Sequence, residues 1–232
     1  MKSTSLETKR IELHDPIPSP AVTRFPSPII QSKIQVPKEE KISTIAHHFR
    51  AILEVLGLDL EDQSISRTPE RVAKMYVEEL FAGLDESTFP SISFFDDEFH
   101  QETRHQMVFV KVGFTSLCEH HLIPMSGFAY VAYIPNKKFI GLSKIPRIVR
   151  YFARRPQLQE RLASQIADSL SILIESENVA VSISARHQCV IARGIQDEHS
   201  HTITNTLRGE FQLDKEIRTE FLDAIHRKDL SH

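Results

Sequence analysis

The sequence is poor in cysteine, in excess basic charge and in long apolar runs, and each shortage excludes a class of protein. Two cysteines in 232 residues cannot form a disulfide framework. A formal net charge of −3 argues against a nucleic-acid binder that depends on overall basicity. No apolar run approaches the roughly 18 residues of a membrane span, and no apolar segment follows the polar N-terminus as in a secretory signal. We therefore expect a cytoplasmic globular protein that neither binds nucleic acid nor enters a membrane.

Residues 1–37 differ in composition from the rest of the chain. Prolines interrupt every candidate helix between Pro16 and Pro37, and polar residues fill many of the gaps. We interpret this stretch as a mobile N-terminal extension, with the alternative that it lies across a neighbouring subunit. Residues 38–232 then form the folded domain.

The apolar pattern of residues 38–232 predicts an α+β domain. Helical spacing across 42–56, and again from Thr68-Pro69 to Gly83, predicts an N-terminal helical hairpin within residues 38–83. A core of about residues 105–212 follows, in which two helices, marked by apolar residues at 145–152 and 162–173, separate two pairs of strands. The expected strands of this antiparallel four-stranded sheet are 106–118, 127–135, 179–191 and 202–211, and a closing helix covers 215–226. Such a sheet has two open edges, which favours closure by oligomerisation.

Both cysteines lie next to histidines, in two segments that are far apart in the sequence. Cys118 and His121 form a Cys-x₂-His half-site, and Cys189 is a candidate third ligand brought in by the fold. Thiolates and imidazoles are the ligands that Zn²⁺ prefers, and three protein ligands leave a fourth position for water, as in catalytic zinc sites. The ordinary alternatives are that Cys189 is a buried structural cysteine and that residues 118–121 form a polar turn. Both alternatives must hold at once if there is no metal site.

Two further histidines and a basic segment accompany this predicted zinc site. His120 and His187 are candidates for proton transfer, with the alternative that they only orient the ligands. Between Lys137 and Arg161 eight basic residues face one acid, Glu160, a local concentration that suits a polyanionic ligand unless it is simply solvated. No Gly-x-x-x-x-Gly-Lys-Ser/Thr loop is present. The carboxylate of Glu160 is able to accept both neighbouring N–H groups of a guanine, although an ordinary solvated glutamate is the alternative.

With these residues in place, the chain closely resembles the GTP cyclohydrolase I family. The matching stretches are 67–75, 116–121, 133–135, 140–144, 155–161 and 187–194, which occur in the family's order and extend from roughly Lys38 to Arg227. The resemblance implies a T-fold (tunnelling fold), in which subunits join their sheets into an oligomeric β-barrel. It also implies a homodecamer of two pentamers, with active sites at the subunit interfaces.

The family converts GTP and water to 7,8-dihydroneopterin triphosphate and formate, the first step of tetrahydrofolate and pterin biosynthesis. The resemblance implies that a zinc ion is held by Cys118, His121 and Cys189. It further implies a guanine anchor at Glu160 and catalytic residues His120, His187 and Ser143. The implied contacts to the triphosphate of GTP are Lys144, Arg147, Arg193 and Arg71. The charged segment 207–210 departs from the small or apolar residues of many relatives.

Two other functions are compatible with parts of this pattern. A tunnelling-fold enzyme that acts on another purine or pterin would also use Glu160 and the basic residues, but the Cys-His-Cys set and residues 140–144 favour the cyclohydrolase. A non-catalytic, zinc-stabilised assembly protein would not need His120 and His187, and both are present.

Overall fold

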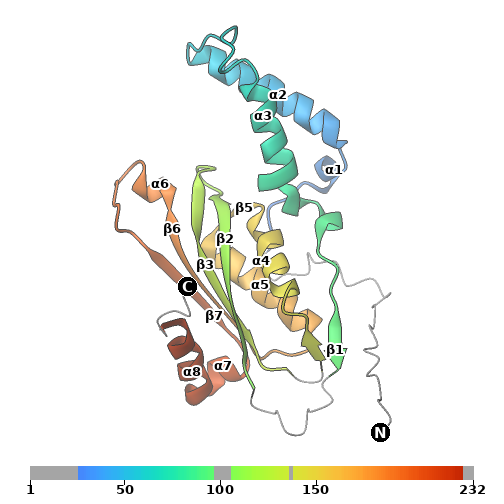
Figure 1. Cartoon of the computed structure of the whole chain (residues 1–232), viewed down its shortest axis with the longest axis vertical. Helices are drawn as coiled ribbons and strands as arrows, with labels where there is room; N and C mark the ends of the chain where they lie inside the picture. The colour runs from blue at the N-terminus through green and yellow to red at the C-terminus, as the bar shows by residue number, and fades with distance from the viewer. Residues whose placement is uncertain (1–25, 97–105, 136–137, 227–232) are drawn as a thin grey trace, which may run out of the picture.

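The computed structural model describes residues 26–96, 106–135 and 138–226, which form an α+β fold (Figure 1). The helices are α1 (Gln31–Ile34), α2 (Lys38–Val55), α3 (Thr68–Lys74), α4 (Lys144–Ala153), α5 (Gln159–Leu173), α6 (Gln188–Ile191), α7 (Glu210–Leu213) and α8 (Lys215–His226). The strands are β1 (Phe94–Asp96), β2 (Val108–Cys118), β3 (Pro124–Tyr133), β4 (Lys138–Ile140), β5 (Pro156–Gln157), β6 (Val179–His187) and β7 (Thr202–Leu207). No helix among these residues is long and apolar enough to cross a bilayer.

The main sheet has five strands, in the order β5–β2–β3–β6–β7, instead of the four that the sequence pattern predicts. The four long strands are antiparallel neighbours, as expected, and the two-residue β5 adds to the end of β2 in parallel, through Leu117–Pro156 and Cys118–Gln157. A separate pair, β1 with β4, lies near the opposite end of β2 (Figure 1). The sheet is therefore mixed. The C-terminal end of β2 pairs with β5, which lies in the segment that connects α4 and α5.

The prediction that Cys189 lies on a strand beside His187 is wrong. β6 ends at His187, and Cys189 lies in the short helix α6. The partner strand β3 begins at Pro124, and its Met125 is paired with His187, so the residues after His187 have no strand to pair with. Apolar alternation continues to Ile191, but a strand needs backbone partners as well as a pattern.

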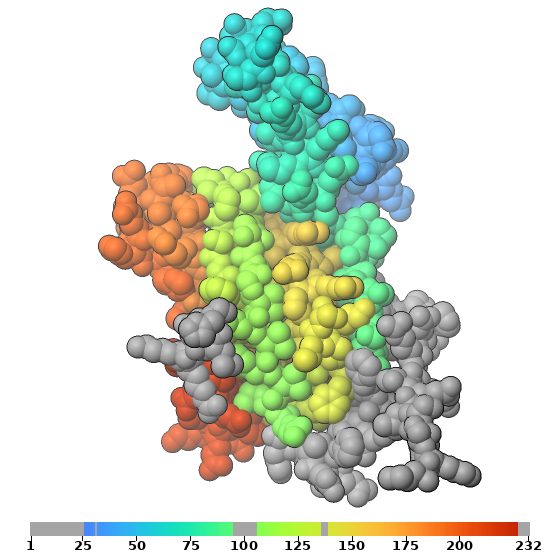
Figure 2. Space-filling view, viewed as in Figure 1, coloured from blue at the N-terminus to red at the C-terminus, as the bar shows by residue number. Residues whose placement is uncertain are grey.

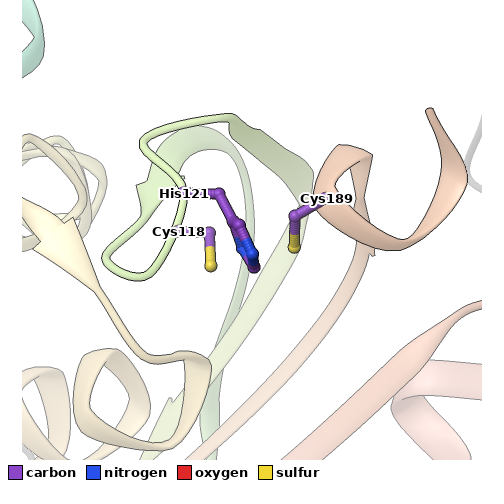
Figure 3. Close-up of side chains that lie close together, drawn as sticks. All are labelled: Cys118, His121 and Cys189. Atoms are coloured by element: carbon purple, nitrogen blue, oxygen red, sulfur yellow. The ribbon is translucent and has the colours of Figure 1, made fainter. Parts of the chain in front are cut away.

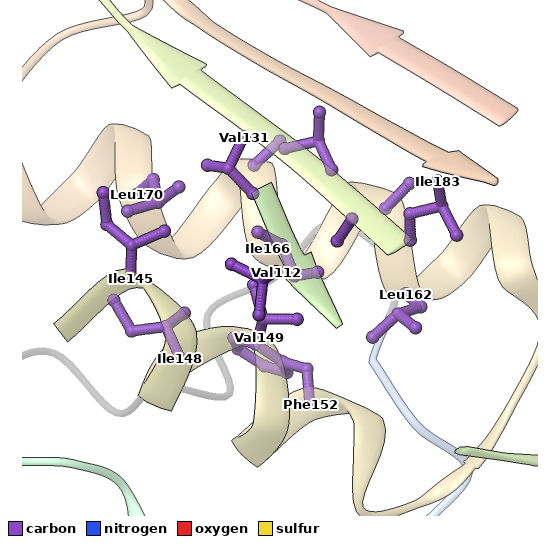
Figure 4. Packing of buried hydrophobic residues seen from close by; sticks show 14 of the residues in the cluster. Val112, Val131, Ile145, Ile148, Val149, Phe152, Leu162, Ile166, Leu170 and Ile183 are labelled. Carbon is purple, nitrogen blue, oxygen red and sulfur yellow. The ribbon is translucent and has the colours of Figure 1, made fainter. Parts of the chain in front are cut away.

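The core lies between the sheet and the helices α4 and α5 (Figure 4). Ile145, Ile148, Val149 and Phe152 recur at helical spacing on α4 and are all fully buried, which explains why this segment forms a helix against the sheet. Each such side chain contributes about 1.5–3 kcal/mol through removal from water. This packing fixes α4 and α5, and with them the connection that carries β5.

Among the described residues, helices cover the other face of the sheet near one end. There α7 and α8 bury Phe211 and Phe221 against Ala132 and Ala180. The predicted closing helix is thus confirmed at its predicted boundaries. Further along this face Phe128 on β3 is 44% exposed and Ile203 on β7 is 61% exposed, so these two apolar side chains stay open to solvent.

An arm of α2 and α3 projects away from the sheet and its covering helices (Figures 1 and 2). α2 has the predicted extent, whereas the second predicted helix changes at Met75 from α-helix to a π-helical turn. The arm joins the body at Gly83, whose N–H donates to the carbonyl oxygen of Arg154 over 3.0 Å. A Cβ atom at Gly83 would lie 2.0 Å from the Tyr151 carbonyl oxygen, so only glycine allows this approach.

The last part of the predicted N-terminal extension contacts the body. Ser27 Oγ accepts hydrogen bonds from Arg155 Nη1 at 3.4 Å and from Gln165 Nε2 at 3.3 Å. Residues 1–25 lie outside the described residues, so the mobility of the extension stays a prediction.

Candidate active site

Three side chains from two remote segments converge at one end of the sheet. Cys118 ends β2, His121 lies in the turn that follows, and Cys189 lies in α6. One ligand atom from each residue lies within 4.8 Å of the others. Figure 3 shows the three side chains pointing the same way, with the His121 ring between the two sulfur atoms. The fold therefore brings together the three ligands predicted from the sequence.

The local backbone explains how Cys118 and His121 reach the same point. The Cys118 N–H donates to the Ile123 carbonyl at 3.0 Å, and the Leu122 N–H donates to the Cys118 carbonyl at 2.8 Å. These bonds close a short turn in which Leu122 adopts a positive φ of 50°. Strain of this kind occurs where a turn must hold side chains in a fixed direction.

The chemistry of the cluster fits a soft divalent cation. Cys118 is buried, and burial, followed by the hydrogen bond and charge of Cys118, raises the pKa of the Cys189 thiol. The Cys189 thiol therefore resists ionisation unless a cation lies beside it, and a metal supplies that charge. Two sulfurs and one imidazole form a donor set typical of Zn²⁺.

Arg193 lies directly beside this cluster. Its Nη1 donates to His121 Nε2 at 2.7 Å. Arg193 is one of the predicted triphosphate contacts. The structure thus brings at least one basic residue predicted to bind the substrate next to the predicted metal ligands. His120 is also close, with its Nδ1 4.0 Å from Cys118 Sγ.

His187 is held by a residue that the sequence analysis missed. Gln159 is 2% exposed, and its Nε2 lies 3.1 Å from the carbonyl oxygens of both Ile183 and Thr202. Because carbonyl oxygens only accept, the amide nitrogen of Gln159 must face them. Its Oε1 therefore faces His187 Nε2, at 2.8 Å, and accepts the proton that this nitrogen carries.

This contact determines which nitrogen of His187 is available for chemistry. With Nε2 protonated toward Gln159, Nδ1 is the remaining nitrogen. Burial lowers the pKa of His187, and the negative charge of Glu160 opposes that change. Glu160 follows Gln159 in the first turn of α5, so this predicted guanine anchor lies on the same helical turn as the residue that orients His187.

Four other predicted site residues lie elsewhere. Ser143 immediately precedes α4 and Lys144 begins it, and Arg147 lies one turn further along. β5 follows the other end of α4, about 15 Å away for a helix of this length. Arg71 lies on α3, within the projecting arm. A single chain does not gather these residues at the metal ligands.

Comparisons with known proteins give one consistent result. The model of the family described as GTP cyclohydrolase I matches residues 45–226. The chain is 48% identical to GTP cyclohydrolase 1 of Aeromonas hydrophila over 190 residues, which cover 82% of this chain and 86% of that protein. It is 51% identical to GTP cyclohydrolase 1 of Vibrio parahaemolyticus over 191 residues, with 82% and 87% covered. For GTP cyclohydrolase 1 of Vibrio cholerae the identity is 49% over 197 residues, with 84% and 89% covered.

Proposed function

Because the chain belongs to the GTP cyclohydrolase I family, we propose that it converts GTP and water to 7,8-dihydroneopterin triphosphate and formate at the Cys118–His121–Cys189 cluster. The observation that carries this proposal is the convergence of these three side chains, with Arg193 bonded to His121. Cys118, His121 and Cys189 would hold a Zn²⁺ ion, which when bound would supply a Lewis acid and a water of lowered pKa.

The residues around the cluster account for the remaining tasks of the reaction. Glu160 accepts the two N–H groups on the pairing edge of guanine and so selects this base over adenine. His187 gives or takes a proton at the imidazole part of the purine through Nδ1, because Gln159 occupies Nε2. His120 and Ser143 handle protons during the later rearrangement of the ribose. Arg193 neutralises part of the triphosphate charge.

The site is completed by a second copy of the chain. Ser143, Lys144, Arg147 and Arg71 match residues that handle GTP in the family, yet they lie at the far end of α4 or on the arm. Within the described residues, the outer edge of β7 has no partner strand, and most of the outer edge of β2 has none. Together with the open sheet face around Phe128, these edges support closure of the sheets into a barrel, as a decamer of two pentamers.

An activity assay with matched variants tests both parts of this proposal. The wild-type protein, incubated with GTP, should release formate and yield a pterin that fluoresces after oxidation. Cys189→Ala and Lys144→Ala should each be inactive alone. After the two are dissociated together and reassembled, activity should return, because some sites then combine an intact Lys144 with an intact Cys189. Absence of formate from the wild type would refute the function, and absence of recovery would refute the shared site.

A further inference from the structure

The turn that carries two of the metal ligands is tied to α5 by an ion pair. Both terminal nitrogens of Arg161 donate to the carboxylate of Glu119, Nη1 to Oε2 and Nη2 to Oε1, the latter at 3.4 Å. The two side chains are only 17% and 20% exposed. A two-pronged contact of this kind fixes direction as well as distance, because the guanidinium is planar.

The positions of the two partners give the ion pair its significance. Glu119 lies between Cys118 and His120, and Arg161 directly follows Glu160. The pair therefore joins the segment that holds the metal to the helical turn that carries the guanine anchor. Arg161, which the sequence analysis groups with the basic residues suited to a polyanion, forms an ion pair with Glu119.

Few other contacts hold these two segments together. β5 pairs with β2 through only two residue pairs, and the Glu119 N–H adds one hydrogen bond to the Gln157 carbonyl at 3.0 Å. Gln157 is itself fixed, because its Nε2 donates to the Phe152 carbonyl and to Gln165 Oε1, both at 2.8 Å. A buried side-chain bond also joins the end of β2 to this connection, because Ser116 Oγ donates to the Arg155 carbonyl at 3.2 Å. The Glu119–Arg161 contact is the ion pair that restrains the distance from the turn itself to α5.

We propose that Glu119 and Arg161 form a positioning pair that sets the distance between the metal ligands and the guanine anchor. This inference rests on the proposed function, because it assigns the pair to a zinc centre and a guanine subsite. Loss of either partner lets the turn move relative to α5. Retention of the metal and discrimination for guanine should then decline together, although neither residue touches the metal or the base.

A double-mutant cycle on the zinc-loaded protein tests this pair. Glu119→Gln and Arg161→Met each keep the approximate size of the side chain and remove its charge. Each should speed the release of zinc to an excess of a metallochromic chelator by about tenfold, the lower end for residues that support metal ligands indirectly. The double variant should release zinc no faster than the more affected single variant. Arg161→Lys, which keeps the charge but loses the planar fork, should lie between wild type and Arg161→Met.

The same variants should lose discrimination between GTP and ATP, measured as the ratio of kcat/KM values. Arg208→Met is the matched control. Arg208, which follows β7, pairs with Asp168 toward the other end of α5, and its side chain is about as buried as that of Arg161. This variant should leave zinc release and base discrimination unchanged. The positioning role of the pair would be overturned if Arg161→Met released zinc no faster than Arg208→Met. It would also be overturned if the effects of Glu119→Gln and Arg161→Met on zinc release added in the double variant. Wild-type protein that binds no zinc or forms no formate would instead overturn the proposed function beneath it.

Discussion

Replacement of Gln159 by methionine should reduce turnover far more than it reduces binding of GTP. Methionine has nearly the volume of glutamine, so the buried space stays filled while the polar contacts are lost. His187 would lose the acceptor that holds its Nε2 proton and fixes its ring. A ring displaced by about 1 Å from its productive position costs on the order of 10²-fold in rate, and loss of proton transfer costs at least that much. We therefore expect kcat to fall by about 10- to 100-fold.

The same replacement also has a cost in stability that can be worked from the structure. The amide has two hydrogens for the oxygens of Ile183, Thr202 and Thr204, and its Oε1 accepts from His187, so about three hydrogen bonds are lost. At about 1 kcal/mol each the free energy of unfolding falls by about 3 kcal/mol. For a chain of this size that corresponds to a decrease in Tm of roughly 6–12 °C.

A buried leucine on the same helix separates the loss of catalysis from the loss of stability. Leu170 is fully buried in the core and lies eleven residues beyond Gln159 on α5, about 16 Å along the helix. Leu170→Ala should lower the free energy of unfolding by about 2–5 kcal/mol, and so lower Tm to a similar extent, and keep kcat close to that of the wild type. Formate release at saturating GTP and differential scanning calorimetry give the two quantities. If Gln159→Met retains kcat as well as Leu170→Ala does, or changes only KM, the orientation of His187 by Gln159 is refuted.

Three further replacements test the individual roles. Cys189→Ala should lower bound zinc from about one ion per chain to a small fraction of that, since two ligands hold Zn²⁺ far less tightly than three, and atomic absorption after dialysis measures the ratio; full occupancy would contradict the ligand set. Glu160→Ala should reduce the preference for GTP over ATP by about 100-fold, because the carboxylate acceptor is lost. Competition kinetics measures this preference, and an unchanged value would contradict the role of Glu160. His187→Ala should bind GTP with little change and lose at least about 100-fold in kcat, so near-normal formate release would remove its catalytic role.

The longer helices and the long strands followed from the sequence because their signals are local. The spacing of Ile145 to Phe152 reports a single buried face, and the structure has the helix where that spacing places it. β5 and β1 have two and three residues, too few for any period to appear, and both form only because distant segments lie beside them. Cys189 was assigned to a strand for a related reason, since the end of β6 depends on where β3 begins.

The metal ligands could be predicted because their chemistry is unusual for the chain, which has only two cysteines. Gln159 and Glu119 could not, because a glutamine or glutamate carries no signal until its partner is known. Gln159 acts through His187, and Glu119 through Arg161, and both partners are remote in sequence. Lys144 and Arg147 belong to the basic segment that the sequence indicates for a polyanion, but their role as triphosphate contacts is implied by the resemblance alone. In one chain they lie at the start of α4, whereas β5 follows its other end.

The close approach of Gly83 to the Tyr151 carbonyl means that the position of the arm depends on a residue without a side chain. Alanine at this position would collide with the Tyr151 carbonyl oxygen and force the backbone away from α4. The arm before it would then shift, and because α3 and the π-helical turn lie between Gly83 and Arg71, a small change at Gly83 would displace Arg71 further. The position of Arg71, a proposed triphosphate contact, thus depends on the absence of a side chain at Gly83.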